Sequence, residues 1–532
     1  MIVKFKNNMF RFNRRIALMV SLVFFACSNF NGQPLKPGFT PGDLYNNITR
    51  NPELVKNFGG ESFAWHATNG GDLFVKAYIL WKDTAWLSWG IRYYEFLRAH
   101  MHAGPDGYIG LIGPSFRDDV LWNNEVISDA LVANLMLEFC ELVINDTRLK
   151  KIYGKKAWEY IVFCKKHMVE KWDKRNLWHE TGDYADYIFG CEFVKPNDFS
   201  SWVSIEKTQA NPWMSIQYNI ANCMGITNLR LYRITGDNFY RDKAEKLFFR
   251  LKSNFQFFDN HYVWNYWSPF YEKDISYDSN RCNHWVNAHK YRAGYQAIEV
   301  SQIAEAYHTG VVFDSNDIQR IINTNLDVMW NKNREHLEFI MSTGRHPDSL
   351  DRNGENAVAG SGTLWSSLSD FSQVILDLSQ RGNERTKASN DIGDKIQLAY
   401  FNNIVVKRHP GFRRKYAEGR PVTVRDVSLG NSPDLNFVGV IPYIIKRGQH
   451  SFVIAKSRNS GNLVIDIYSA DGATKIKTIY HGSIIGDDDG LRGFRITRWD
   501  GIDPDGKIEF KGEYLVRWTL NGKYRDYAIK IE

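Results

Sequence analysis

The feature that most constrains this chain is a series of long segments in which apolar residues recur every three to four positions. The clearest is residues 125–145, where an apolar side chain stands at every fourth position: Ile127, Leu131, Leu135, Phe139 and Val143. This period matches one face of an α-helix and does not match a strand, whose side chains alternate between two faces. Residues 125–145 are therefore predicted to be an amphipathic helix.

The same period predicts further helices over residues 72–81, 85–100, 151–171, 215–233, 238–254, 295–309, 315–330, 363–380 and 391–404. Few strand-like alternations stand between them, so the sequence predicts an all-α domain of about 370 residues with about ten to twelve helices. We place this domain at residues 51–405, after a lead over residues 28–50. Helical hairpins arranged in a ring would bring the long aromatic loops between them to one end of a central cavity.

Beyond residue 405 the pattern changes from helical to β. Residues 406–434 contain Pro410, Gly411, Gly419 and Pro421, which is typical of a linker. Seven runs of β-forming residues follow, over residues 437–445, 451–455, 463–468, 475–480, 494–499, 514–520 and 527–531. Asp-Gly and Asn-Gly pairs, as in hairpin turns, separate several of these runs. The sequence predicts a small β-sandwich over residues 435–532.

The first 27 residues have the pattern of a secretory signal peptide. Five Lys and Arg residues and no acid precede the apolar run Ile16–Ala26, which is too short to span a bilayer. Ala26-Cys27-Ser28 fits a cleavage site, and Cys27 also fits the lipid-bearing cysteine of a lipoprotein, with Phe24 in place of the usual leucine. We expect an exported protein in the periplasm or at the cell surface, with either full cleavage or a lipid anchor at Cys27.

Several classes of function are excluded by charge and motifs. The formal charge of +7 includes those five leader charges, and the remainder is near neutral with no nucleic-acid recognition motif. No Walker A loop, GxSxG or HExxH is present. The cysteines after residue 27 form no CxxC pair, which excludes a zinc ribbon and favours buried free thiols, with one disulfide bridge as the alternative. The sequence predicts no metal site and no cofactor.

The chemistry is concentrated in residues 262–295. Within sixteen residues this window gathers an unusual number of hydrogen-bonding side chains: Asn280, Asn283, His284, Trp285, Asn287, His289, Tyr291, Arg292 and Tyr295. A buried structural loop rarely carries so many donors and acceptors, whereas a loop that binds sugar needs them beside aromatic rings. We therefore expect a carbohydrate site here.

These residue types are suited to catalysis on an acidic polysaccharide. Elimination across C4 and C5 of a uronate needs a group that offsets the carboxylate charge, and the candidates are Arg292 or an Asn or Gln amide. It also needs a base for the C5 proton and an acid for the leaving oxygen, and His284, His289 and Tyr295 are candidates for both. We expect substrate contacts from a wider set: His66, Asn124, Glu125, Asn219, Asn283, Trp264 and Trp267.

Two alternatives remain open. A glycoside hydrolase would use paired carboxylates, and the acids that flank polar loops are Asp72, Glu125, Asp183 and Asp186. A surface glycan-binding protein with an adhesive tail would bind without turnover. In each case the expected partner is an oligo- or polysaccharide, anionic in the first interpretation, and not a nucleic acid.

Short phrases along residues 60–380 resemble a known group of bacterial proteins. They are Ala64-Trp65, Gly107-Tyr108, Trp122-Asn-Asn-Glu125, Leu231-Tyr-Arg-Ile-Thr-Gly-Asp237, Tyr262-Val-Trp-Asn-Tyr-Trp267 and Ala306-Tyr-His-Thr-Gly310. This pattern resembles the (α/α)-toroid uronate lyases and glycuronyl-processing enzymes, and within that group the dehydratases of ulvan degradation. The resemblance implies a six-hairpin-like toroid and a lyase or dehydratase that leaves an unsaturated uronate.

The sequence departs from this group in one informative place. Its relatives carry an acid-acid-x-Ser-His phrase before the Ala-Tyr-x-x-Gly, where this chain has Tyr291-Arg-Ala-Gly-Tyr295. An acidic position has become Arg292, which fits an anionic substrate. At the other end, Ile465-Asp-Ile-Tyr-Ser-Ala-Asp-Gly472 and Gly512-Glu-Tyr-Leu515 resemble the immunoglobulin-like modules of the flagellar-hook-cap type. That resemblance implies no catalytic role for the β-sandwich.

Overall fold

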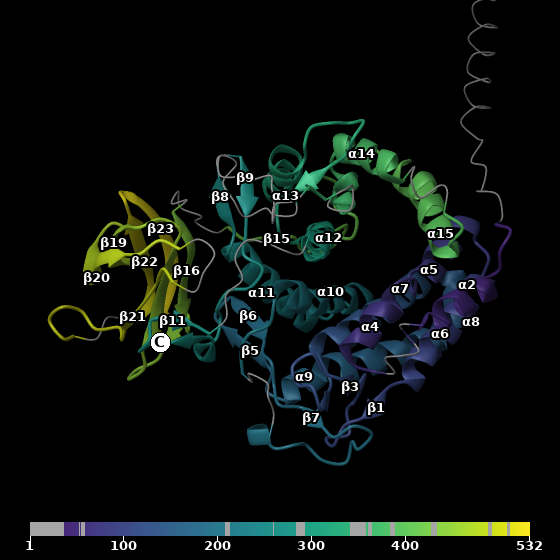
Figure 1. Ribbon diagram of the computed structural model, residues 1–532, viewed down its shortest axis with the longest axis horizontal. Coiled ribbons are helices and arrows are strands. Elements are labelled where there is room, and N and C mark those ends of the chain that lie inside the picture. The colour runs from purple at the N-terminus through teal and green to yellow at the C-terminus, as the bar shows by residue number, and fades with distance from the viewer. Residues whose placement is uncertain are drawn as a thin grey trace, which may run out of the picture.

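The computed structural model describes residues 37–52, 54, 59–207, 213–258, 260–283, 293–340, 358–359, 364–383, 389–426, 434–487, 492–507 and 511–532. Figure 1 shows a ring of helices with a separate β-sandwich packed against one side. The predicted fold class, a mainly α toroid followed by a small β-sandwich, is confirmed.

The helices of the ring follow the periodic segments. Their bounds are α2 (Pro41–Thr49), α4 (Gly60–Thr68), α5 (Leu73–Trp81), α6 (Ala85–Ala99), α7 (Val126–Asn145), α8 (Thr147–Phe163), α9 (Lys171–Lys174), α10 (Tyr218–Thr235), α11 (Asn238–Ser253), α12 (Ala293–Thr309), α13 (Ser315–Asn323), α14 (Gln373–Asn383) and α15 (Ile392–Tyr400). Wider π-helical turns extend three of them, over Cys164–Glu170, Thr324–Met329 and Phe401–Val405. The sequence did not predict α2 or α4.

The helices form an inner and an outer layer. α4, α7, α10 and α12 lie side by side, and α7 and α10 are followed by α8 and α11, which pack on their outside. In α10, 15 of the 18 residues are buried, whereas in α8 only six of the 17 residues are. α15 returns to contact α5 and α2, so the last helix of the ring closes it against the first ones.

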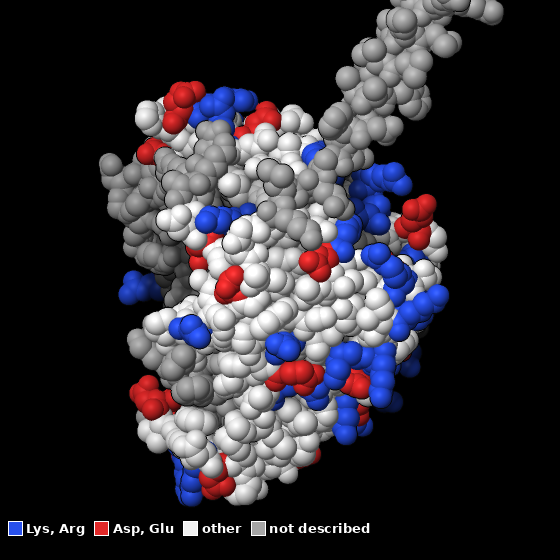
Figure 2. Space-filling model, turned by 90° about the vertical axis from the view of Figure 1, so that its right-hand side faces the viewer, with Lys and Arg blue, Asp and Glu red and all other residues white. Residues whose placement is uncertain are grey.

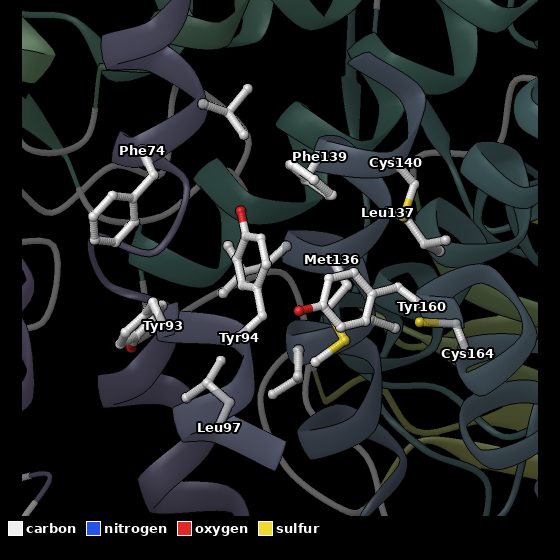
Figure 3. Packing of buried hydrophobic residues seen from close by; sticks show 14 of the residues in the cluster. Phe74, Tyr93, Tyr94, Leu97, Met136, Leu137, Phe139, Cys140, Tyr160 and Cys164 are labelled. Carbon is white, nitrogen blue, oxygen red and sulfur yellow. The ribbon is translucent and has the colours of Figure 1, made fainter. Parts of the chain in front are cut away.

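Aromatic side chains fill the space between the layers. Figure 3 shows Tyr94 of α6, Phe139 of α7 and Tyr160 of α8 turned toward one another. The Tyr94 ring centroid lies 5.8 Å from that of Phe139 and 5.9 Å from that of Tyr160, within the range of favourable aromatic pairs. Cys140 and Cys164 lie in the same cluster as free thiols, as predicted. Burial raises the pKa of both, so they act as small apolar groups.

Short strands join the helices. They are β1 (His102–Ala103), β2 (Ile109–Gly110), β3 (Gly113–Pro114), β4 (Trp122–Asn123), β5 (Trp178–Thr181), β6 (Tyr184–Tyr187), β7 (Phe193–Val194), β8 (Gln256–Phe258), β9 (His261–Val263), β10 (Ile275–Ser276), β11 (Arg281–Cys282), β12 (Val311–Val312), β13 (Phe339–Ile340), β14 (Val358–Ala359) and β15 (Thr423–Val424). The sheet β3-β4-β7 is the one that bears on the site, because it holds the loop between α6 and α7 against the start of α4.

The C-terminal domain consists of two facing sheets. One has the order β16-β18-β21 and the other β17-β23-β22-β19-β20. The strands are β16 (Leu435–Ile441), β17 (Ile444–Ile445), β18 (Ser451–Ser457), β19 (Gly461–Ser469), β20 (Lys475–Ile484), β21 (Phe494–Trp499), β22 (Gly512–Leu520) and β23 (Lys523–Ile531). The single run predicted over residues 437–445 is divided between the two sheets. Pro442 marks the division, because it has no N–H to donate to a ladder.

The segment after α15 lies against the ring. β15 pairs with β12, and Arg414 donates hydrogen bonds to the carbonyls of Tyr307 (2.7 Å) and Phe313 (3.0 Å). The sandwich is also in direct contact with the ring, where Tyr443 stacks edge-on against Tyr184 at 5.4 Å. Within the described part of the chain, no helix combines the length and the hydropathy needed to cross a bilayer.

Candidate active site

A pocket of about 600 Å³ opens at one end of the ring, where four inner helices begin. The first residues of α4, α7, α10 and α12 contribute to its wall through Glu61, Val126, Asn219 and Tyr295. Its volume is in the range of small-molecule sites. Because the N-terminal end of a helix carries partial positive charge, the four helix starts make the pocket favourable for negative charge.

Close backbone packing positions the first of these helices. Gly59 and Gly60 precede Glu61 and lie against Ile112 and Gly113 at β3, so closely that a Cβ on Gly113 would overlap the backbone of Gly59. Gly60 also has φ +70°, a conformation that favours glycine. The glycines therefore let α4 start directly beside the loop that carries Arg117 and Glu125, which brings Glu61 into the same pocket.

Glu61 and Glu125 form a pair of carboxyl groups with different environments. Burial and the nearby charge of Glu125 raise the pKa of Glu61 to about 7, although the indole N–H of Trp65 donates to it at 3.0 Å. Glu125 instead accepts hydrogen bonds from the Arg117 guanidinium at 2.7 Å and from the Asn123 amide at 2.5 Å. One carboxyl therefore holds a proton near neutral pH, and the other is ion-paired.

Two further groups interact with Glu125. Burial raises the pKa of Glu192 to about 7, with a smaller contribution from the charge of Glu125. Arg117 also donates to the carbonyl of Gly190 at 3.0 Å and lies over the rings of Phe189 (4.6 Å) and Phe193 (4.9 Å). These contacts hold Arg117 in place, so the charge beside Glu125 is fixed.

The remaining wall is aromatic with a few amide groups. Tyr266 stacks on Tyr295 at 5.5 Å, and Trp267 meets Phe189 edge-on at 6.1 Å. The amide oxygens of Gln217 and Asn219 are buried and accept no hydrogen bond from a described residue. Asn219 lines the pocket at 1% exposure, so its oxygen can accept a hydrogen bond from a ligand hydroxyl at little desolvation cost.

Of the site residues predicted from the sequence, the structure brings four to this pocket: Glu125, Asn219, Trp267 and Tyr295. It places four others elsewhere. His66 is half-buried on α4 and does not line the pocket, and Asn283 is exposed, with its amide bonded to the carbonyl of Lys273 at 2.7 Å. Trp264 is fully buried and donates to Glu299 at 2.7 Å. Asn124 accepts from the ammonium of Lys171 at 2.5 Å and does not line the pocket.

The four carboxylates considered as candidates for hydrolysis are also divided between the pocket and other parts of the structure. Asp72 pairs with Lys76 at 2.5 Å, Asp183 with Arg425 at 2.8 Å and the fully buried Asp186 with Arg250 at 2.5 Å. Only Glu125 lies in the pocket. The three aspartates are therefore in structural ion pairs.

The predicted cluster of His284, His289 and Arg292 lies outside the described residues. It stands in the sequence directly before α12, whose first turn carries Tyr295 into the pocket. Its role therefore stays a prediction. Among described residues, no group of three or more His, Cys, Asp or Glu side chains has the arrangement of a metal site.

The sequence did not point to Glu61, Arg117 or Glu192. The signal that was available for Glu61 is the pair Gly59-Gly60 directly before it, followed by Trp65 one helical turn later. A glycine pair of this kind indicates close backbone approach, and the i, i+4 spacing allows the indole to bond the carboxyl.

No family model matches this chain, and no curated protein matches it. Several solved structures are similar to this chain. An inactive variant of the α-1,6-mannanase GH76A of Salegentibacter sp. HEL1_6, in complex with α-1,6-mannotriose, is 12% identical over 72% of this chain and 94% of that one, with a TM-score of 0.31. The glycoside hydrolase from family 105 of C. acetobutylicum is 12% identical over 69% and 82%, with a TM-score of 0.34.

The third structure is the cellobiose 2-epimerase from Bacillus thermoamylovorans B4167, 13% identical over 72% of this chain and 92% of that one, with a TM-score of 0.32. Similarity at this level carries no activity and no residue role over to this chain. The interpretation of the pocket therefore depends on its own side chains.

Proposed function

We propose that this protein is a carbohydrate-active enzyme that cleaves a C–O bond of a glycan bound in the pocket, with Glu61 as the proton donor. The observation that carries the proposal is the pair formed by Glu61, whose pKa is raised to about 7, and the ion-paired Glu125. Most enzymes that break a glycosidic bond use two carboxyl groups, one protonated and one ionised.

In this proposal the two acids have separate tasks. Glu61 gives its proton to the oxygen that leaves, so that the bond breaks without forming an alkoxide. Glu125 keeps its negative charge beside Arg117 and stabilises the positive charge that develops on the sugar ring. A water molecule then adds to the sugar and gives a proton to the Glu61 carboxylate, which completes a hydrolysis and restores the acid.

The wall of the pocket supports a sugar as the ligand. Rings of Trp267, Tyr266 and Tyr295 offer flat apolar surfaces, and the amide oxygens of Gln217 and Asn219 offer acceptors for hydroxyl groups. Arg117 is already paired with Glu125, so the described side chains leave no unpaired cation in the wall for a carboxylate. The described side chains of the wall therefore favour a neutral sugar, whereas the four helix starts favour an anionic one.

A second candidate is the predicted lyase or dehydratase that eliminates across C4 and C5 of a uronate. Two observations favour it: Tyr295 lines the pocket, and four helix starts converge on it and favour a negatively charged group. In this case Tyr295 or a histidine of residues 284–289 takes the C5 proton, and Arg292 offsets the substrate carboxylate.

Mass spectrometry of the products from neutral and anionic oligosaccharides separates these possibilities. Hydrolysis adds one water for each bond cleaved, lyase cleavage adds none, and a dehydratase removes one water without cleaving the chain. The two elimination products also absorb ultraviolet light. A glycan that binds but is never consumed would contradict both enzymatic proposals and favour a binding protein.

Three variants then assign the roles. Under hydrolysis, Glu61→Gln should lower kcat roughly 10²- to 10⁴-fold, while Tyr295→Phe retains most activity. Under elimination with Tyr295 as the base or the acid, the order of the two effects is reversed. Asp183→Asn is a matched control, because this half-exposed acid lies outside the pocket in an ion pair with Arg425.

A further inference from the structure

The outer face of α8 carries an unusual mixture of side chains. Residues 147–166 contain seven Lys and Arg residues and one acid, Glu159. On the same face Ile152, Trp158 and Val162 are 59%, 45% and 61% exposed. Large apolar side chains this exposed are common singly, but three on one face of one helix form a patch.

Helical geometry places the cations between these apolar side chains. At 100° per residue, Lys151, Lys155 and Lys166 fall on the same side of α8 and its π-helical extension as Trp158 and Val162. All three lysines are exposed and form no ion pair with a described residue. Lys156, by contrast, is paired with Glu159 at 2.6 Å.

The opposite side of α8 is packed against the neighbouring helices α6 and α7. Leu149, Ala157, Tyr160 and Ile161 are buried against α7. The hydroxyls of Tyr153 and Tyr160 are hydrogen-bonded to Ser88 and Glu95 of α6. Figure 2 looks at this side of the ring and shows Lys and Arg gathered along one edge of it. The mixed face is therefore a rigid part of the outer layer, and the ring does not need its exposed side chains for packing.

We propose that this face of α8 docks the protein on a membrane that contains anionic lipids. Lysines at the border of an exposed apolar face attract anionic headgroups, and the apolar side chains gain free energy when they enter the boundary between headgroups and acyl chains. An anionic polysaccharide would use the lysines equally well. It would gain little from the aliphatic Ile152 and Val162, so the membrane fits the whole face better.

The course of the chain is consistent with a membrane on the α8 side of the ring. The described structure enters the fold at residue 37, directly before α2, which packs on α6, the neighbour of α8. A lipid at Cys27, ten residues earlier, would hold this side of the ring near a membrane. The proposal for α8 stands on its exposed side chains and does not require that anchor.

The test is cosedimentation of the full chain with vesicles of phosphatidylcholine, with and without phosphatidylglycerol. We expect stronger binding to the anionic vesicles. Replacing Lys151, Lys155 and Lys166 by Gln should weaken that binding about fivefold for each lysine. A second variant, with Ile152, Trp158 and Val162 replaced by Ser, should weaken binding to both kinds of vesicle. Because all variants share one N-terminus, the differences report on α8.

The matched control replaces Lys446, Lys511 and Lys523 of the β-sandwich by Gln, which removes the same charge from another exposed surface. We expect it to bind as the unmodified chain does. Equal binding by the α8 lysine variant and the unmodified chain would overturn the proposal. Lysine-dependent binding to a sulfated polysaccharide without vesicle binding would also overturn it, and would assign the face to an anionic glycan.

Discussion

Glu61 and Glu192 are two acids whose pKa is raised to about 7 by burial, and the charge of Glu125 contributes to both shifts. The pKa values of both acids are raised, but the two changes have different consequences. Glu61 lines the pocket, where a proton near pH 7 is useful for chemistry. Glu192 is buried at 8% exposure and does not line the pocket, so its shift bears on stability.

The first prediction concerns the pH dependence of activity. If Glu61 donates the leaving-group proton, kcat/KM should fall as pH rises through about 7, because the free enzyme loses that proton. Steady-state rates between pH 5 and pH 9 on the substrate identified by mass spectrometry measure this. In the Glu61→Gln variant, kcat/KM should no longer fall above about pH 7. An unchanged fall in this variant would contradict the assignment.

The second prediction concerns Glu192 and stability. Its pKa is raised from 4.5 to about 7, so the folded protein holds a proton that the unfolded chain releases, and stability is lost as pH rises from about 4.5 to about 7. Glu192→Gln removes this cost, so it should stabilise the protein by about 1–3 kcal/mol at pH 8 and far less at pH 5. Urea unfolding at both pH values measures it. An equal gain at both pH values would show that the gain does not come from the proton.

For individual residues, the sequence predicted only part of the site. Glu125 was predicted because it ends a polar phrase directly before a strongly periodic helix. Glu61 was missed because α4 is short and lacks that period, and because its raised pKa depends on a carboxylate from a distant part of the chain. Local patterns do not encode contacts of that kind.

Among the elements, α7 and its preceding loop depend on a buried ion pair. Lys171 and Asp129 lie 2.5 Å apart, and both side chains are fully buried. Lys171 also donates to Asn124 at 2.5 Å and to the carbonyl of Ile109 at 3.0 Å, so it ties α9 to the loop that carries Glu125.

The third prediction follows from this pair. Lys171→Met leaves Asp129 buried without its partner and should lower the free energy of unfolding by about 3–5 kcal/mol. Adding Asp129→Leu removes the unpaired charge, and the double variant should recover a large part of that loss. Guanidinium unfolding of the three proteins gives the coupling. A double variant no more stable than Lys171→Met would contradict this role of the pair.

The element boundaries were predicted where period and capping agree. α11 was predicted over residues 238–254 and spans Asn238–Ser253, with the Asp237 side chain accepting from the N–H of Phe239 at its start. The short strands between the helices were not predicted, because pairs such as β3 and β4 have only two residues each and show no alternation.

The whole molecule is a ring and a sandwich that share an extensive contact. Asn280 of the ring donates to the carbonyl of Phe494 at 2.6 Å and accepts from the N–H of Ile496 at 2.5 Å. Tyr184 lies between Tyr443 (5.4 Å) and Tyr527 (5.6 Å) of the sandwich. Both domains were predicted from their periods, but this contact was not, because it joins turn residues and loop aromatics that carry no pattern.

The fourth prediction tests that contact. Tyr443→Ala removes a ring that is 7% exposed and should lower the free energy of unfolding by about 2–4 kcal/mol. Near-ultraviolet circular dichroism during thermal unfolding should show one transition at a lower Tm, since both domains lose the same contact. Tyr524→Ala is the control, because Tyr524 is 48% exposed on the same sandwich. Two separated transitions in the unmodified chain would contradict the coupling.

The closure of the ring by α15 against α5 and α2 has a consequence for biogenesis. During synthesis the helices up to α14 emerge before their closing partner exists, and an open ring exposes the apolar seam of α5. Forming this seam joins segments separated by most of the domain, which makes it a late and slow step of folding. The ring therefore cannot be completed until α15, its last helix, has been synthesised.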